Sequence, residues 1–268
     1  MTWPQVVAHR GASAAAPEHT LAAYERAISE GADALECDVR LTADGKLVCV
    51  HDRRIDRTSS GRGPVSTATL AELDAHDFGS WHDNWDDFED PPDIDESRSR
   101  VLTLERLLEL TAAADVQLAI ETKHPTRYGG LVESGVVELL ARFGLDRSPA
   151  EGPSRVRVMS FSTQALRRMR ALAPDVPTVL LMQHVAIRYR DGQLPFGSRI
   201  AGPGISIIRA HPEFVSKVQS AGNQVHVWTV DEVSDIDLCL DLGVDAIISN
   251  RPAEVLARRA ERCSAPAD

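Results

Sequence analysis

The stretch Asp33-Ala34-Leu35-Glu36-Cys37-Asp38-Val39, followed by the turn signal Ala43-Asp44-Gly45, decides the fold. Residues 33–39 combine apolar residues with two acids spaced two positions apart. This pattern is typical of a β-strand, whose side chains alternate between two faces. The turn signal separates two strand-like runs, so residues 41–52 are expected to form a β-hairpin rather than a strand-helix unit.

Short apolar runs of the same kind extend in both directions and alternate with helical patterns, such as Leu104, Leu107 and Leu108. The strand candidates are Gln5–His9, Asp33–Val39, Gln117–Glu121, Val156–Ser160, Thr178–Met182, Gly204–Ile208, Val225–Trp228 and Asp245–Ser249. Eight strands separated by helices in a chain of this length predict an α/β fold, a single (β/α)8 TIM barrel. A doubly wound sheet is the competing fold, but no G-x-G-x-x-G motif opens a helix after the first strand.

Residues 53–100 interrupt this rhythm, because they carry few strand or helix signals and end in an acidic piece studded with aromatic residues. An unstructured segment of that length is unusual in a compact domain, so it is predicted to be an insertion over one face of the barrel. Residues 184–203 are similarly irregular where another helix is expected. No internal repeat and no linker marks a second core, so residues 1–268 are expected to form one catalytic domain.

The composition excludes two classes of partner. Hydrophobic residues make up 43% of the chain and charged residues 26%, so a sizeable core can form and global disorder is excluded. The formal net charge is −11, whereas a nucleic-acid-binding protein needs a basic face, and an acidic protein is also disfavoured on anionic membranes. A small phosphate compound can still bind if a few cations or a metal ion are focused in one cleft.

The cysteines and the N-terminus favour a cytoplasmic location. Cys37, Cys49, Cys239 and Cys263 show no paired spacing, so they are expected to be free thiols in a reducing compartment. The first residues pass directly into the first strand without room for a signal peptide. No segment approaches the roughly 18 apolar residues that a membrane span needs. The oligomeric state is left open.

Candidate site residues are found at the carboxyl ends of the predicted strands, where barrels of this kind place their active sites. Glu36 and Asp38 share one face of their strand, about 6.6 Å apart at roughly 3.3 Å per residue, and Cys37 points the other way. Glu121 and Lys123 repeat this spacing on the next parallel strand. Three carboxylates in one mouth repel one another unless a cation neutralises them, and such hard oxygen ligands suit Mg²⁺ or Ca²⁺.

Two histidines are expected beside this acidic cluster. His9 ends the first strand, and a two-residue turn at Asp44-Gly45 sets His51 opposite Asp38, on the same face. A three-residue turn shifts this register by one position. Two imidazoles flanking a reacting group can serve as general base and general acid near neutral pH.

The strand ends also supply cations for a phosphate. Arg10 offers a fork that fits phosphate oxygens, and Lys123 adds a point charge. Phosphate, metal ion and two histidines together indicate phosphoryl transfer to water or to a neighbouring hydroxyl.

These residues lie in motifs that resemble the glycerophosphodiester phosphodiesterase family. The motifs are His9-Arg10-Gly11, Pro17-Glu18-His19-Thr20-Leu21, Glu36 through Gly45, Val50-His51-Asp52, Glu121-Thr122-Lys123 and Trp228-Thr229-Val230. The resemblance implies a barrel with a small insertion after His51 and a Mg²⁺- or Ca²⁺-dependent site. It also implies hydrolysis of small glycerophosphodiesters to glycerol 3-phosphate and an alcohol, within lipid and glycerol metabolism.

The resemblance further implies a role for each site residue. Glu36, Asp38 and Glu121 would hold the metal ion, His9 and His51 would act as acid and base, and Arg10, Lys123 and Trp228 would bind the phosphate and the substrate. Three positions depart from the usual family pattern. His19 and Asp231 stand where asparagine is usual, and Asn250 replaces the commoner aspartate. None of them removes a proposed ligand or catalyst, but they leave the substrate preference open.

Two other functions are weighed against this one. Phosphoinositide-cleaving phospholipase C barrels are similar in using two histidines but place a basic residue where a metal ion would sit, so the three acids here favour the metal-dependent family. A non-catalytic barrel that binds a phosphorylated metabolite would be favoured by the loss of a histidine or a metal ligand, and all of them are present.

Overall fold

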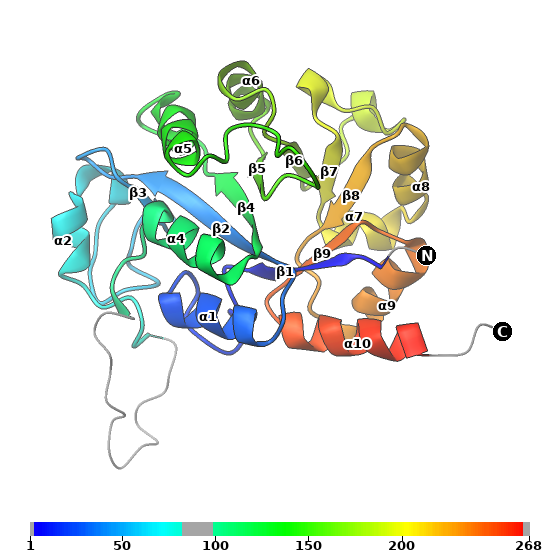
Figure 1. The fold of residues 1–268 in the computed structure, drawn as a ribbon, viewed down its shortest axis with the longest axis horizontal. Coiled ribbons are helices and arrows are strands. Elements are labelled where there is room, and N and C mark those ends of the chain that lie inside the picture. The colour runs from blue at the N-terminus through cyan, green and yellow to red at the C-terminus, as the bar shows by residue number, and fades with distance from the viewer. Residues whose placement is uncertain (1–2, 82–98, 265–268) are drawn as a thin grey trace, which may run out of the picture.

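The polypeptide forms a closed barrel of eight parallel strands in a computed structural model that describes residues 3–81 and 99–264 (Figure 1). The ring closes because β1 pairs with both β9 and β2, which confirms the predicted TIM barrel. A ninth strand, β3, lies outside the ring and pairs with β2 in the antiparallel direction. The strands are β1 Gln5–His9, β2 Ala34–Leu41, β3 Leu47–Cys49, β4 Gln117–Thr122, β5 Val156–Ser160, β6 Thr178–Met182, β7 Ile200–Pro203, β8 Gln224–Val227 and β9 Ala246–Ser249.

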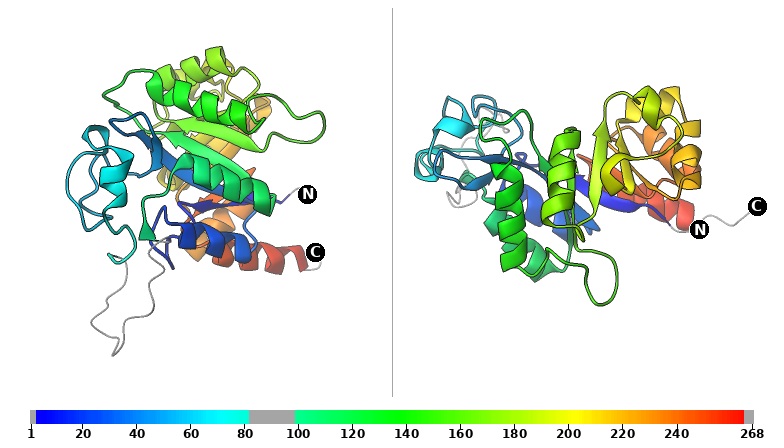
Figure 2. Two further views of the ribbon diagram at one scale, coloured as in Figure 1. Left: turned by 60° about the vertical axis from the view of Figure 1, so that its left-hand side comes forward. Right: turned by 90° about the horizontal axis from the view of Figure 1, so that it is seen from above.

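Helices cover the outside of this sheet (Figures 1 and 2). They are α1 Leu21–Ser29, α2 Leu70–Asp74, α4 Leu104–Ala114, α5 Leu131–Arg142, α6 Thr163–Leu172, α7 Ile205–Ala210, α8 Glu213–Ser220, α9 Val233–Leu242 and α10 Pro252–Ser264. Side-chain oxygens of Thr20, Thr103 and Ser162 accept hydrogen bonds from the first turns of α1, α4 and α6. Such caps satisfy backbone donors that a helix leaves unpaired, which is why these helices begin where they do. No helix among the described residues is both long enough and apolar enough to cross a membrane.

The core is divided by the sheet into two layers. Most buried apolar side chains lie between the strands and the outer helices, and Cys37 is among them, as its position on β2 predicts. A smaller cluster fills the barrel interior and includes Val7, Ala119, Met159 and Val179. The four cysteines are free, as expected. The interior cluster separates the two ends of the barrel from each other.

The predicted insertion packs against the hairpin. It contains the 3-10 turn Val65–Thr67 and the short helix α2, which lies beside β3 at one edge of the molecule (Figure 1). Its own small core joins Ile55, Leu73 and Phe78 to Val48 of β3. Most of the acidic piece, residues 82–92, lies outside the described residues.

The sixth predicted strand, Gly204–Ile208, is wrong. Residues Ile205–Ala210 form helix α7, and the strand is the preceding segment Ile200–Pro203. This strand, Ile-Ala-Gly-Pro, carries a weak β signal because glycine and proline are both depleted in strands. Glycine fits closely there, since a Cβ on Gly202 would lie 2.8 Å from Leu181 Cδ2 and the leucine side chain would have to shift. The segment that the pattern left irregular, residues 184–203, therefore holds two 3-10 turns and this strand.

The hairpin register based on a two-residue turn is also wrong. The observed pairs are Val39 with Cys49, Arg40 with Val48 and Leu41 with Leu47, and Val50 N donates to Asp38 O at 3.0 Å. The turn is one residue longer, because Thr42 N donates to Lys46 O at 2.9 Å and Gly45 adopts a φ of +77°. Three-residue hairpin loops with a left-handed glycine are a common alternative to two-residue loops. His51 therefore does not lie opposite Asp38.

Candidate active site

The predicted site residues meet at the carboxyl end of the strands, around a pocket of about 170 Å³. Its lining is formed by His9, Arg10, Glu36, His51, Glu121, Lys123, Met159, Phe161, Leu181, Gln183, Trp228, Thr229 and Ile248. Of the predicted site residues, Asp38 alone is missing from this lining, because its side chain is fully buried. His51 lies at the mouth of the barrel as expected, although the predicted hairpin register is wrong.

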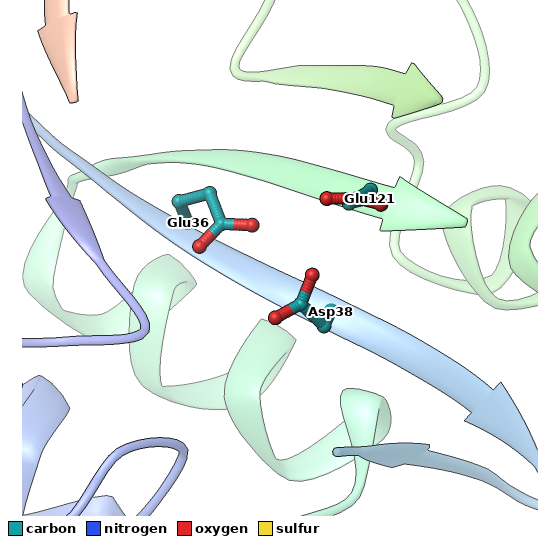
Figure 3. A group of neighbouring side chains, drawn as sticks. All are labelled: Glu36, Asp38 and Glu121. Carbon is teal, nitrogen blue, oxygen red and sulfur yellow. The ribbon is translucent and has the colours of Figure 1, made fainter. Parts of the chain in front are cut away.

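Three carboxylates come together because the register of two neighbouring strands aligns them. Glu36 and Asp38 lie on one face of β2, and Asp38 pairs with Glu121 of β4. One oxygen of each carboxylate lies within 4.8 Å of the other two, and Figure 3 shows the three side chains gathered over β2 and β4. All three are buried. The alternation of side chains along the strands, which predicted this meeting, is confirmed.

Two cations and a histidine surround Asp38. Lys123 Nζ lies 3.1 Å from Asp38 Oδ1 and 2.8 Å from Glu121 Oε1. Arg10 Nε and His19 Nε2 lie 2.9 Å and 3.0 Å from Asp38 Oδ2. Burial alone would raise the pKa of Asp38, but the hydrogen bond from His19 and the two cationic charges hold that pKa well below its ordinary value. Asp38 is therefore ionised at neutral pH.

The two glutamates are shifted in the opposite direction. Burial raises the pKa of Glu36 well above its ordinary value, and the charge of Asp38 adds to this effect. The same two causes raise the pKa of Glu121 to about 8, although the charge of Lys123 opposes them. A divalent cation would favour the ionised form of both glutamates, and its affinity would rise with pH as it displaces their protons. The donor set consists of buried carboxylate oxygens, which fits Mg²⁺ or Ca²⁺.

The first strand ends in a tight turn that positions Arg10. Arg10 and Gly11 both have positive φ, 58° and 86°. A Cβ on Gly11 would lie 2.6 Å from the backbone carbon of Ala23 in α1, so a side chain has no room there. Arg10 N donates to Glu36 Oε2 at 3.1 Å, and its NH1 donates to Glu18 Oε1 at 3.1 Å. The guanidinium predicted to bind phosphate is thus held among acids at the edge of the pocket.

The tautomer of His9 is fixed by two residues from the far end of the chain. His9 Nδ1 lies 2.7 Å from Asn250 Oδ1, and Asn250 Nδ2 donates to Asp231 Oδ2 at 2.6 Å. Because Asp231 orients the amide oxygen toward His9, Nδ1 is the donor and Nε2 keeps a lone pair. Nε2 lies 3.9 Å from Glu36 Oε2. Burial, and then the charge of Arg10, lower the pKa of His9 to about 4, so its ring is neutral near pH 7.

His51 is held in a different, more charged environment. Its Nδ1 lies 2.7 Å from Asp52 Oδ1, and Asp52 Oδ2 accepts a hydrogen bond from Arg57 Nε at 2.7 Å. Arg57 in turn donates to both carboxylate oxygens of Glu18. Arg40 fixes the backbone by donating to His51 O at 3.0 Å and 2.6 Å. Burial lowers the pKa of His51. Asp52 accepts a hydrogen bond from Nδ1–H of His51, which leaves Nε2 available to a ligand.

One wall of the pocket is apolar. The rings of Phe161 and Trp228 meet edge to face, with their centroids 5.3 Å apart. Trp228 is fixed by the hydrogen bond from its Nε1 to Gly202 O at 2.7 Å, and Met159 and Leu181 also line the pocket. An aromatic face held in this way suits the carbon side of a small polyol.

Residues 9–254 match the glycerophosphoryl diester phosphodiesterase family. The chain belongs to this family. It is 46% identical to a Mycobacterium tuberculosis protein described as probable glycerophosphodiester phosphodiesterase 1, with 96% of each chain covered. It is 34% identical to the glycerophosphodiester phosphodiesterase of Bacillus subtilis, over 92% of this chain and 83% of the relative.

A solved structure agrees with this assignment. The Oleispira antarctica phosphodiesterase in complex with the product sn-glycerol-3-phosphate matches this chain with a TM-score of 0.82 at 26% identity, and 96% of each chain is covered. Like its relatives in the family, this protein is a phosphoric diester hydrolase.

The positions that depart from the usual family pattern support the site directly. His19 bridges Tyr24 OH, 2.8 Å from its Nδ1, and Asp38, while Asn250 and Asp231 orient His9. The sequence drew attention to these three residues but assigned them no role. Their place in motifs that follow the strands was the available signal, whereas their contacts join residues up to 241 positions apart.

Proposed function

We propose that this enzyme hydrolyses glycerophosphodiesters to sn-glycerol 3-phosphate and an alcohol, and that it needs one divalent cation, Mg²⁺ or Ca²⁺. Glu36, Asp38 and Glu121 would hold this cation, which when bound supplies positive charge for the phosphate oxygens. The observation that carries the proposal is the meeting of three buried carboxylates with His9 and His51 at the carboxyl end of the barrel.

His9 and His51 move the protons of this reaction. Burial and the charge of Arg10 keep His9 neutral, so the lone pair on its Nε2 is free to take the proton of the attacking hydroxyl. Burial lowers the pKa of His51, but the carboxylates of Asp38 and Asp52 oppose this shift and stabilise its imidazolium, so His51 gives a proton to the leaving oxygen. A glycerol substrate carries a neighbouring hydroxyl, and its attack would form a cyclic phosphate. Water then opens this phosphate with the proton roles reversed.

Arg10, Lys123 and Trp228 bind the substrate. The two cations are placed within 3.1 Å of the acidic cluster, where they can turn to phosphate oxygens once a metal ion neutralises the carboxylates. The apolar wall at Trp228 and Phe161 packs against the glycerol carbons. The related Oleispira antarctica enzyme was solved with sn-glycerol-3-phosphate, which supports a ligand of this class.

A phosphodiester panel tests the proposal. Glycerophosphocholine, glycerophosphoethanolamine, glycerophosphoglycerol and a diester without glycerol are assayed for release of sn-glycerol 3-phosphate, before and after exhaustive chelation. We expect turnover of the glycerol diesters alone, its loss on chelation, and its return with Mg²⁺ or Ca²⁺. Full turnover by the metal-free enzyme would instead favour a mechanism like that of the phosphoinositide phospholipases. No release from any glycerol diester would overturn the proposal.

A further inference from the structure

The interior of the barrel is polar at both ends, and only the carboxyl end is used by the active site. At the amino end, Gln5, Gln117, Arg157 and His226 alternate along their strands with residues of the helix-facing core. Their side chains therefore point into the barrel, below the apolar interior cluster. This amino-terminal polar layer has no part in the proposed reaction.

Arg157 is buried in this layer without a counter-charge. Its NH1 donates to Gln117 Oε1 at 3.3 Å, an oxygen that also accepts a hydrogen bond from Gln5 Nε2 at 3.0 Å. Its Nε and NH2 are buried and have no hydrogen-bond partner, and the side chain forms no ion pair within residues 3–81 and 99–264. A second unsatisfied atom, His226 Nδ1, is buried nearby.

The lowered pKa of Arg157 shows that burial disfavours its charged form. Burial lowers the pKa of Arg157 to about 10, and the only opposing influence is the charge of Glu36 on the other side of the interior cluster. Burial, and then the charge of Arg157, lower the pKa of His226 well below its ordinary value. A neutral histidine and two amides can orient a ligand but cannot neutralise a guanidinium. A buried charge without a partner is strongly unfavourable unless an ion of opposite sign compensates it.

A cavity of about 790 Å³ opens onto this layer. Arg157 and His226 line it together with two further arginines, Arg170 and Arg199, neither of which forms an ion pair with a described residue. The carboxylates in the lining are Asp175 and Asp245. Arginine therefore outnumbers carboxylate in this cavity, although the whole protein carries a net charge of −11.

We propose that this amino-terminal cavity binds a compact oxyanion, namely phosphate or a phosphate monoester, with Arg157 as its buried anchor and Arg199 at its rim. The planar guanidinium offers Nε and NH2 as a fork that two phosphate oxygens can accept. His226 and Gln117 flank the fork and can orient the bound anion. The site is separate from the catalytic pocket and does not depend on the proposed function.

Calorimetric titration of the full-length, Mg²⁺-loaded enzyme with inorganic phosphate tests the proposal. Lys123→Ala first removes one phosphate contact of the active site, and the binding at the second, amino-terminal site is compared in that background with and without Arg157→Met by a two-site fit. We expect Arg157→Met to raise the Kd for phosphate by at least about tenfold. The matched control is Arg155→Met, which removes an arginine that pairs with Asp115 outside the cavity and should leave the Kd unchanged.

A rim variant keeps the test decisive if the Arg157→Met protein does not fold. Arg199 is exposed, so Arg199→Ala folds, and it should raise the phosphate Kd by about threefold, as expected for a solvated phosphate contact. Phosphate should also raise the Tm of the parent protein, and chloride at equal ionic strength should not. The proposal is overturned if Arg157→Met leaves the phosphate Kd unchanged. If the Arg157→Met protein is unfolded, an unchanged phosphate Kd in Arg199→Ala overturns it. So does an absence of phosphate binding in the Lys123→Ala background.

Discussion

The two ends of the barrel interior carry charges of opposite sign, and they differ in whether these charges are paired. At the carboxyl end Lys123 contacts both Asp38 and Glu121, and Arg10 contacts Asp38, so the charge of Asp38 has two partners of opposite sign. At the amino end Arg157 has only the amide oxygen of Gln117. Both ends are formed by inward-facing residues of the same strands, so the barrel imposes the position of the side chains but not their pairing.

The loops that surround the two ends differ in the same way. The carboxyl end continues into loops that add Asp52 and Arg57, whose hydrogen bonds orient His51, the proton donor that we propose. The amino end has a cavity and a charge, but its polar residues do not orient an acid or a base toward one another. This contrast agrees with the general placement of chemistry at the carboxyl ends of barrel strands. It also agrees with binding, rather than catalysis, as the use that we propose for the amino end.

The largest effect is expected for the histidine pair. His9→Ala and His51→Ala should each lower kcat by about 100-fold or more, as is typical when general acid–base catalysis is lost. Metal affinity should be nearly unchanged, because neither imidazole is proposed as a ligand. Steady-state kinetics at saturating Mg²⁺ and a direct metal titration measure the two quantities.

His211→Ala is the matched control for the histidine pair, since His211 is exposed on the outer surface between α7 and α8. It should retain the activity of the parent enzyme. Near-normal turnover in His9→Ala or His51→Ala would mean that the residue in question has a structural role. The contrast between a catalytic and a non-catalytic end would then rest on the carboxylates alone.

A smaller effect is expected for Lys123→Ala. This change removes a cation that contacts both Asp38 and Glu121, and the loss of an uncompensated phosphate contact costs about 2 kcal/mol. We therefore expect kcat/KM to fall by about 30-fold. Lys217→Ala serves as the control, because Lys217 pairs with Glu213 on the surface of α8. Unchanged kinetics in Lys123→Ala would show that Lys123 pairs with Asp38 and Glu121 but does not bind the phosphate.

The sequence predicts the carboxyl end of the barrel well because its signals are local. The alternation of Glu36 and Asp38 on β2 follows from the geometry of any strand, and their meeting with Glu121 follows from parallel pairing. Strands that are buried on both faces are rich in apolar residues, so most strands could be placed within one or two residues. The exception, β7, has a glycine and a proline and owes its pairing to β6 rather than to its own pattern.

The rest of the site depends on contacts between distant parts of the chain. The hairpin register was decided by one extra turn residue and by the hydrogen bonds of Thr42. The orientation of His9 depends on Asn250 and Asp231, which no local pattern connects to it. Arg157 was missed for another reason. One arginine within an apolar strand gives no sign that its guanidinium lacks a partner, because that depends on every neighbouring strand.

The difference that separates the two ends most directly is the pH dependence of stability in the metal-free protein. The pKa of Glu121 is about 8 in the folded state and 4.5 ordinarily. Between these values the folded state holds a proton that the unfolded chain has released, so the contribution of Glu121 to stability is full below about pH 4.5 and is lost as the pH rises toward 8. Glu121→Gln stays neutral and escapes this loss. Its advantage in unfolding free energy over the parent should therefore grow between about pH 4.5 and pH 8 by at least about 1.4 kcal/mol, the equivalent of one pKa unit.

Arg157→Met provides the contrast at the amino end. The guanidinium remains charged across this pH range, so its removal should stabilise the protein by a nearly constant amount, and the two curves should run parallel. Urea unfolding of the three proteins in chelator and without phosphate, at fixed ionic strength, measures both differences. Saturating Mg²⁺ should abolish the pH-dependent advantage of Glu121→Gln, because a metal ion displaces the proton from Glu121 in the parent. The difference between Arg157→Met and the parent should not change with Mg²⁺. A parallel curve for Glu121→Gln, or a curve for Arg157→Met that diverges from the parent with pH, would show that the two ends do not differ in the way their charges indicate.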